Sequence, residues 1–176
     1  MKSSLRRAVG TVAAGAAAVG MVALMGAGAV ADSASRPRFP MPEPYGTTFQ
    51  KDPQHDFSKR IRPRHDGILR GWVYAYDAKE HTAEYAPIKW VKRTKAFVAP
   101  GEYDVMRYSS RVSPKAVLYS ARDCDSTKVT VDSRGLGTKK CGKSALLAHL
   151  RAGERPAMIT VYRGEIVKIQ EIYERR

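Results

Sequence analysis

The sequence predicts a mainly β domain, either a small antiparallel barrel or a sandwich, with one short helix and a Pro-rich extended arm before it. Three observations predict this class. The 176 residues are 43% hydrophobic, which suits a globular core. After Gly67, apolar and aromatic residues alternate with period two through several short stretches. One stretch, Ser144 to Ala152, has the spacing of an amphipathic helix.

Residues 1–31 have the composition of a secretory signal peptide. Lys2, Arg6 and Arg7 precede an uncharged stretch rich in Ala and Gly, which ends in the small-x-small site Ala29-Val30-Ala31. The segment resembles the long Ala-rich signals of secreted Gram-positive proteins. A retained membrane anchor is the alternative, because an uncharged stretch of this length can span a bilayer. We expect export, and hence an extracellular protein.

Residues 32–66 form the predicted arm. They contain six of the ten prolines, and seven Lys and Arg residues make them basic. Proline fixes φ and lacks an N–H donor, so this stretch suits neither a helix nor the interior of a sheet. We expect an extended, mobile arm over 32–66, followed by a β domain over 67–176.

The β domain begins with a strand over Ile68–Tyr76, in which Trp72, Tyr74 and Tyr76 share one face. A second strand is predicted over Thr82–Lys92, where Pro87 indicates a sheet edge or a bulge. The remaining short strands expected before the helix are Lys95–Val98, Tyr103–Tyr108, Ala116–Ala121 and Lys128–Val131.

The last third of the chain holds the helix and the clearest hairpin. Leu146, Leu147 and Leu150 form the apolar stripe of the helix, and Gly153 stands where a C-cap glycine belongs. Two apolar stretches then flank a two-residue turn, a typical hairpin signal. The predicted strands are Ala157–Tyr162 and Glu165–Tyr173, joined by Arg163-Gly164.

Several strands, one helix and a final hairpin make an order of elements that resembles OB-fold barrels, from Gly67 to Tyr173. The resemblance implies a closed barrel with a ligand-binding face. It does not imply which ligand, because one fold serves many functions.

Cys124 and Cys141 are the only two cysteines. In an exported protein they predict one disulfide, which staples the domain. Closing a loop of this length is worth about 3 kcal/mol in the chain-entropy model. A reactive thiol or a metal ligand is the alternative, although two cysteines at this spacing form no metal signature by themselves.

Two groups of residues are candidates for binding an anion. Basic residues flanking an aromatic ring suit a single-stranded nucleic acid or another anionic polymer. The alternative is that Trp72, Ile88 and Trp90 belong to the core and the charges form a solvated face. The candidates are Lys89, Trp90, Lys92 and Arg93 in one segment, and Lys139, Lys140 and Lys143 in a Gly-rich turn.

That turn also fits a P-loop pattern, since Gly137 to Ser144 reads G-x-x-x-x-G-K-[ST]. No apolar strand ending in Asp supplies a second magnesium ligand, and alternating βα units are missing. We therefore expect a basic, disulfide-linked turn that can hold an anion, and no bound nucleotide.

The pairs His55-Asp56 and His65-Asp66 could bind a metal or serve in acid–base chemistry. The alternative is that they are solvated polar residues of the arm, and we expect neither a metal nor a cofactor. His149 is expected at the surface of the helix. The sequence has no nucleophile elbow, HExxH or triad signature, so no catalytic residue is assigned.

The formal net charge of +14 favours an anionic partner. We expect a secreted, monomeric, non-catalytic protein that binds an anionic polymer or the cell-envelope surface. A secreted inhibitor or accessory factor that binds another protein is the second hypothesis. A small extracellular hydrolase that uses clustered acids or the His and Asp residues is the third.

Overall fold

The structure, a computed structural model, describes residues 37–58, 62–101, 106–124 and 126–174. The predicted signal peptide, residues 1–31, lies outside the described residues, as do residues 32–36 of the predicted arm.

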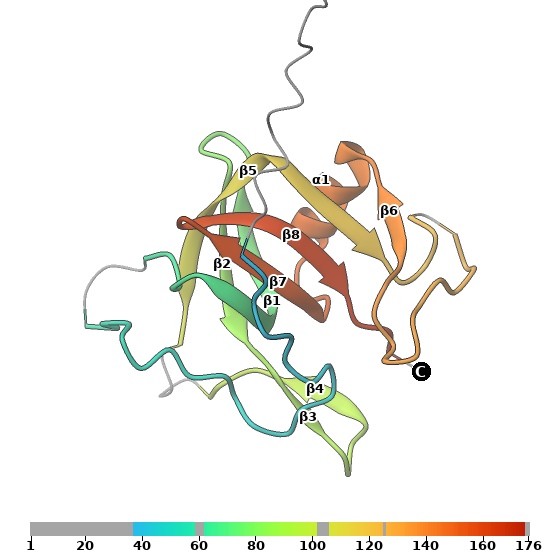
Figure 1. Cartoon of the computed structure of the whole chain (residues 1–176), viewed down its shortest axis with the longest axis horizontal. Coiled ribbons are helices and arrows are strands. Elements are labelled where there is room, and N and C mark those ends of the chain that lie inside the picture. Colours follow the sequence, from blue (N-terminus) through green and yellow to red (C-terminus); the bar gives the residue numbers. More distant parts are fainter. Residues whose placement is uncertain (1–36, 59–61, 102–105, 125, 175–176) are drawn as a thin grey trace, which may run out of the picture. The chain divides into compact units, whose positions relative to one another are not determined.

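Five strands close a β-barrel (Figure 1). Around the ring, each strand pairs with the next, and β5 pairs with β2 to close it. A sixth strand, β6 (Lys139–Cys141), extends the sheet along β5. The barrel strands in ring order are β1 (Gly67–Asp77), β7 (Ala157–Tyr162), β8 (Glu165–Glu171), β5 (Tyr108–Ser120) and β2 (Thr82–Pro87).

One seam of the barrel is parallel. Strand direction cannot alternate all the way around a ring of five, so one neighbouring pair must run the same way. That pair is β5 and β8, and the other four pairs are antiparallel. The predicted small barrel with one short helix is confirmed, and the predicted antiparallel pairing holds at every seam but this one.

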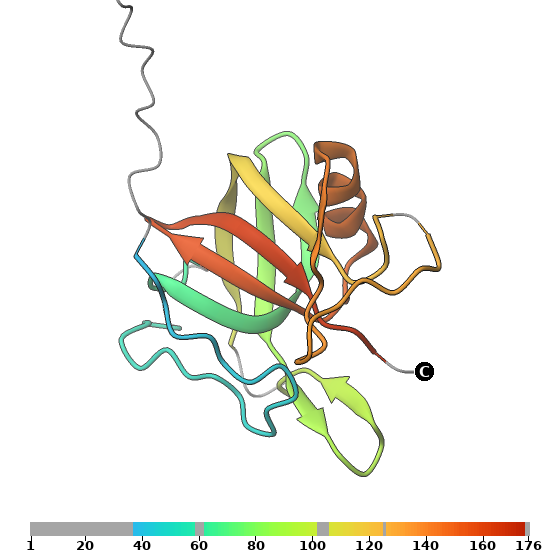
Figure 2. The same ribbon diagram turned by 45° about the vertical axis from the view of Figure 1, so that its right-hand side comes forward.

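The helix α1 (Lys143–Ala152) lies between β6 and β7 in the chain, before the last two strands, as the OB-like order predicts. Leu146 and Leu150 bury its apolar side in the barrel core, and Gly153 ends it with φ 62°. Figure 2 shows α1 beside the barrel strands. Among the described residues, no helix is long and apolar enough to cross a membrane.

The core has two parts. Strand side chains alternate between faces, so on β7 Ile159 points into the barrel while its neighbour Met158 points out. The interior cluster includes Leu69, Val73, Tyr85, Tyr108, Leu118, Leu146, Leu150, Ile159, Ile166 and Ile169. A smaller outer cluster consists of Ile88, Phe97, Leu136, Met158 and Ile172, with Met41, Tyr45, Ile68, Trp72 and Trp90 packed against it.

A separate two-stranded hairpin covers the outer cluster. Its strands are β3 (Lys89–Val91) and β4 (Ala96–Val98), with Trp90 opposite Phe97. The predicted strand Thr82–Lys92 is therefore two strands, since the chain leaves the barrel after Pro87. The Ile88 N–H then bonds the Arg70 carbonyl at 3.0 Å, which fixes the direction of the hairpin.

The described part of the arm has no helix or strand, as its prolines predict, yet it is held against the barrel (Figure 1). Arg70, a buried residue of β1, donates from its guanidinium to the carbonyls of Ile88 (2.9 Å), Glu43 (2.6 Å) and Thr48. The Gln50 side chain donates to the Ile68 carbonyl at 3.0 Å and accepts from the Arg70 N–H. These contacts replace the free arm expected from the sequence.

Strand β5 is longer than predicted. The predicted strand Ala116–Ala121 is confirmed up to Ser120, but it is the end of a strand of 13 residues that begins at Tyr108. The predicted strand Tyr103–Tyr108 lies mostly outside the described residues, which omit 102–105, and Met106 and Arg107 are not part of a strand. A break in the register of β5 with β8 between Val112 and Val117 accommodates Pro114. Lys128–Val131 is not a strand, because Val131 makes only an isolated bridge to Gly137.

Candidate functional site

The first group of predicted anion-binding residues lies on the β3–β4 hairpin. Lys89 is half-buried on β3, and Lys92 and Arg93 are exposed in the turn together with Lys95. The segment Lys89–Val98 contains no acidic residue. Within the described part of the chain, none of its four cations makes an ion pair.

Trp90, predicted to contact the anion, is half-buried at the base of this hairpin. Its ring lies edge-on, 5.3 Å from the Tyr45 ring and 4.9 Å from the Phe97 ring, measured between centroids. The Lys89 Nζ lies 4.7 Å from the centroid of the Phe49 ring. The aromatic rings thus fix the hairpin to the arm and to the outer cluster, while the charges of the turn face solvent.

The second predicted group lies elsewhere on the surface. Lys139 and Lys140 are exposed on β6, and Lys143 is the first residue of α1. Figures 1 and 2 show β6 beside α1, whereas the β3–β4 hairpin projects below the barrel. Lys139 is partly neutralised, because its Nζ lies 3.3 Å from Asp123. The structure therefore does not join the two groups into one site.

The P-loop-like segment is shaped by packing. Residues 139–141 pair with Leu118–Ser120 of β5, and Cys141 forms the predicted disulfide with Cys124. A Cβ at Gly137 would lie 2.5 Å from the Ser120 carbonyl carbon, so only glycine fits there. The first glycine of the pattern is thus explained by close contact with the sheet.

A buried polar network joins α1 to the barrel. Glu171 of β8 accepts from the Ser120 hydroxyl and the Ala121 N–H, each at 2.8 Å, and its other oxygen lies 2.9 Å from His149 Nδ1. Burial raises the pKa of Glu171, but the hydrogen bonds from His149, Ala121 and Ser120 outweigh it and lower the pKa to about 2.

His149 is only 3% exposed, so the prediction that it lies at the helix surface is wrong. Sequence reasoning did not find Glu171, which lies 22 residues away in the chain. No local signal connects the two residues.

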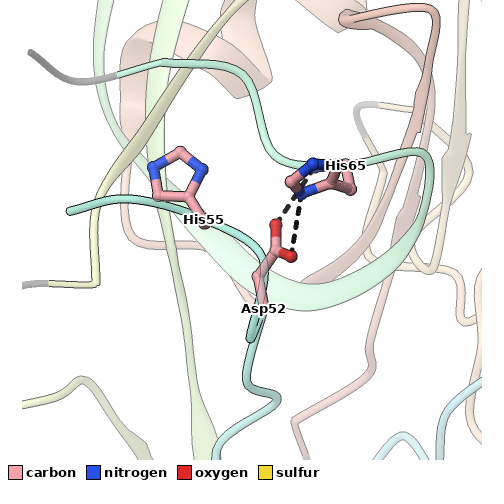
Figure 3. A group of neighbouring side chains, drawn as sticks. All are labelled: Asp52, His55 and His65. Carbon is pink, nitrogen blue, oxygen red and sulfur yellow. Dashed lines mark hydrogen bonds and ion pairs between the residues drawn. The ribbon is translucent and has the colours of Figure 1, made fainter. Parts of the chain in front are cut away.

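The arm brings its two histidines together around a buried carboxylate (Figure 3). Asp52 Oδ1 lies 2.9 Å from His65 Nδ1, and Oδ2 accepts from the His65 N–H at 3.1 Å. The His55 N–H donates to the Asp52 carbonyl at 3.0 Å, which brings the His55 ring to the same side. One ligand atom from each of Asp52, His55 and His65 lies within 4.8 Å of the others.

The sequence predicted the two histidines but not Asp52; it pointed instead to the adjacent Asp56 and Asp66. Asp52 is the residue that is buried, at 7% exposure. The signal that could have indicated it is Pro53, because an Asp-Pro pair favours the start of a turn.

Aromatic side chains surround His55. Its ring lies 4.4 Å from the Phe57 ring and 4.9 Å from the Tyr108 ring, between centroids. Burial, as the largest effect, lowers the pKa of His55. The Tyr108 hydroxyl is buried and has no hydrogen-bond partner among the described residues.

A cavity of about 300 Å³ opens between the β1–β2 turn, β5 and the first turn of α1. Lys143, from the second predicted group, lines it together with Arg111, His81 and Leu147. Glu80 and Glu165 also line it, so its charges are mixed.

Comparison of the chain with protein-family models, with curated proteins and with solved structures finds no match to any of them.

Proposed function

We propose that this chain is a secreted, non-catalytic protein that attaches to phosphate-bearing anionic polymers of the cell envelope through the tip of the β3–β4 hairpin. The observation that carries the proposal is the set of four cations on ten residues that contain no acid: Lys89, Lys92, Arg93 and Lys95.

The hairpin suits electrostatic attachment because its base is rigid and its tip is charged. Trp90 and Phe97 pack with Tyr45, so the orientation of the turn is fixed before any partner binds. Preorganisation reduces the ordering cost of binding. No acid among the described residues forms an ion pair with the exposed Lys92 or Arg93, so the charge of both side chains is available to a partner.

The basic charge of the whole chain supports the same partner. A net charge of +14 attracts polyanions over long range, and charged contacts to a polyanion release its counterions. The signal-like N-terminus supports export, and outside the cell the abundant polyanions include wall polymers that carry phosphate. The cations on β6 contribute less, because Asp123 faces Lys139.

The experiment compares matched pairs of cations. The full chain and three double variants are bound to isolated cell envelope and to immobilised polyphosphate, each at low and high salt. Each cation near an anionic surface is worth about 1 kcal/mol, so Lys92→Ala with Arg93→Ala is expected to weaken binding by about thirtyfold. Lys139→Ala with Lys140→Ala is expected to weaken it less.

The matched control removes two exposed cations elsewhere, Lys128 and Arg151, and is expected to bind almost as well as the unchanged chain. An equal loss in all three variants would show that net charge alone carries binding. Retention on one protein that resists high salt would favour a protein partner. Either outcome would overturn the assignment to the hairpin.

A further inference from the structure

We infer that Asp52, His55 and His65 form a binding site for a divalent metal ion of the Zn²⁺ type. The inference is independent of the proposed attachment to polymers, since none of these residues lies on the β3–β4 hairpin. It rests on geometry, on how the carboxylate is held, and on the chemistry of the three ligands (Figure 3).

The three side chains are close enough to share one ion. In a tetrahedral zinc site with bonds of about 2.0 to 2.1 Å, neighbouring ligand atoms lie about 3.3 Å apart. Here the ligand atoms of the three residues lie within 4.8 Å of one another, and Asp52 Oδ1 and His65 Nδ1 are 2.9 Å apart. Small rotations of the two imidazoles would bring the three atoms to the spacing that an ion requires.

The backbone holds the carboxylate in place. The His65 N–H donates to Oδ2 of Asp52 at 3.1 Å, which leaves Oδ1 as the atom directed at the imidazole. The His55 N–H donates to the Asp52 carbonyl, so this turn fixes the backbone position from which the His55 imidazole extends. Contacts that orient ligands in this way are typical of metal sites.

The ligand types select the class of metal. Two imidazole nitrogens and one carboxylate suit Zn²⁺ and its neighbours, whereas Ca²⁺ and Mg²⁺ prefer sets made of oxygen only. Three protein ligands leave a fourth tetrahedral position for water. The His65 side chain is 54% exposed and that of Asp52 only 6%, so an ion can reach the buried carboxylate from solvent through the histidine side.

Some charged side chains around the cluster favour a positive charge there, and others oppose it. Asp52 and Asp56 favour a positive charge beside His55, whereas His65 and Arg62 oppose it. Arg64 directs its guanidinium to the His65 carbonyl at 3.0 Å. The two carboxylates are thus offset by two arginines, so the inference rests on the geometry of the three ligands and not on a net negative charge.

The test is a titration of the full chain, produced without a polyhistidine tag, with Zn²⁺ in a calorimeter. Co²⁺ is used as a second probe, because its visible absorption reports a tetrahedral site with nitrogen ligands. We expect one ion per chain, and we expect His65→Ala to weaken Zn²⁺ binding by at least the 10- to 100-fold that removing a supporting interaction costs.

The matched control is His81→Ala, which removes an exposed histidine outside the cluster and is expected to leave Zn²⁺ binding unchanged. His55→Ala repeats the test from the other imidazole. Because the His55 ring packs on Phe57, the folding of the His55→Ala variant is checked by circular dichroism. If His55→Ala does not fold, the result for His65→Ala decides the test. Zn²⁺ affinity that is equal in the unchanged chain and in His65→Ala, or no saturable binding at all, would overturn the inference.

Discussion

At the scale of single residues, Glu171 shows how a largely buried charge is stabilised in this barrel. Its carboxylate accepts from the Ser120 hydroxyl, the Ala121 N–H and His149. A carboxylate buried without such partners would have a raised pKa, but here hydrogen bonds lower the pKa of Glu171 to about 2. The residue thus connects β8 to β5 and to α1 most strongly when it is ionised.

This network predicts a specific loss of stability in acid. The folded pKa of about 2 lies below the ordinary value of 4.5, so the stabilisation is complete above about pH 5 and is lost as the pH falls toward 2. At about 1.4 kcal/mol per pH unit, the whole effect is about 3 kcal/mol. Urea unfolding measured between pH 2 and 7 checks it.

Glu171→Gln should be less stable than the unchanged chain at pH 7 and should show a flatter dependence on pH. The control is Glu154→Gln, which changes an exposed acid that takes no part in the hydrogen bonds of Glu171 described above. If the Glu171→Gln curve keeps the full acid dependence of the unchanged chain, the network is not its source.

Residues in local patterns could be predicted, and residues in long-range pairs could not. The disulfide followed from the presence of just two cysteines, and the glycine at the end of α1 from its place in the sequence. Asp52 and Glu171 were missed because each acquires its role from a residue that only the fold brings near. The basic candidates stay a prediction, and their separation into two groups depends on the path of β6.

At the scale of elements, the strength of the local pattern decides which strands are predictable. β1 and the β7–β8 hairpin alternate clearly, and Arg163 and Gly164 both have positive φ, as the predicted tight turn requires. β5 carries Ser109, Ser110, Ser113 and Pro114, which have weak strand propensity. Its continuity comes from pairing with β2, β8 and β6, which no local window contains.

The arm is the element whose role changes most between sequence and structure. Its prolines predict a lack of regular structure, and its contacts with the rest of the domain, above all with the buried Arg70, fix its path. Arg70 has no carboxylate partner among the described residues, so backbone carbonyls alone satisfy its guanidinium. Gly46 lies against it, where a Cβ would be 2.3 Å from Nη1.

Replacing Arg70 should release the arm. Arg70→Met keeps an apolar side chain of similar length but removes three donated hydrogen bonds, one of them to the buried Ile88 carbonyl, so we expect a loss of about 3 kcal/mol in the free energy of unfolding. Trypsin should cut the arm faster at the exposed Lys51, read by mass spectrometry. The control Arg111→Met removes an exposed arginine of β5. Equal cleavage rates in the two variants would contradict the role given to Arg70.

At the scale of the whole molecule, closing the strands into a ring gives each strand one face toward the barrel interior and one face toward the outside. Inward residues fill the interior cluster, and the outer cluster is covered by the arm and by the β3–β4 hairpin. Apolar side chains are therefore well hidden: among the described residues, Val129 is the only large hydrophobic side chain that is exposed. Polar and charged side chains therefore dominate the surface, and the net charge of the chain is strongly positive.

A surface of this kind suits the proposed electrostatic attachment to a polyanion. Contacts between cations and phosphates depend on salt, because each contact releases a condensed counterion. Stacking of a partner on Trp90, as the sequence predicted, would add a contribution to the binding free energy that does not depend on salt. The Trp90 ring, however, already packs against Tyr45 and Phe97. The salt dependence therefore distinguishes the two modes of binding.

The decisive measurement is the dissociation constant of the full chain for polyphosphate of one defined length, followed over a range of salt concentrations. Electrostatic attachment through the hairpin predicts a straight line of log affinity against log salt. In Lys92→Ala with Arg93→Ala the slope should fall by about 1.4, or about 0.7 for each phosphate that the variant no longer neutralises. A slope that stays the same in this variant would contradict the proposal, because the hairpin would then contribute no ionic contacts.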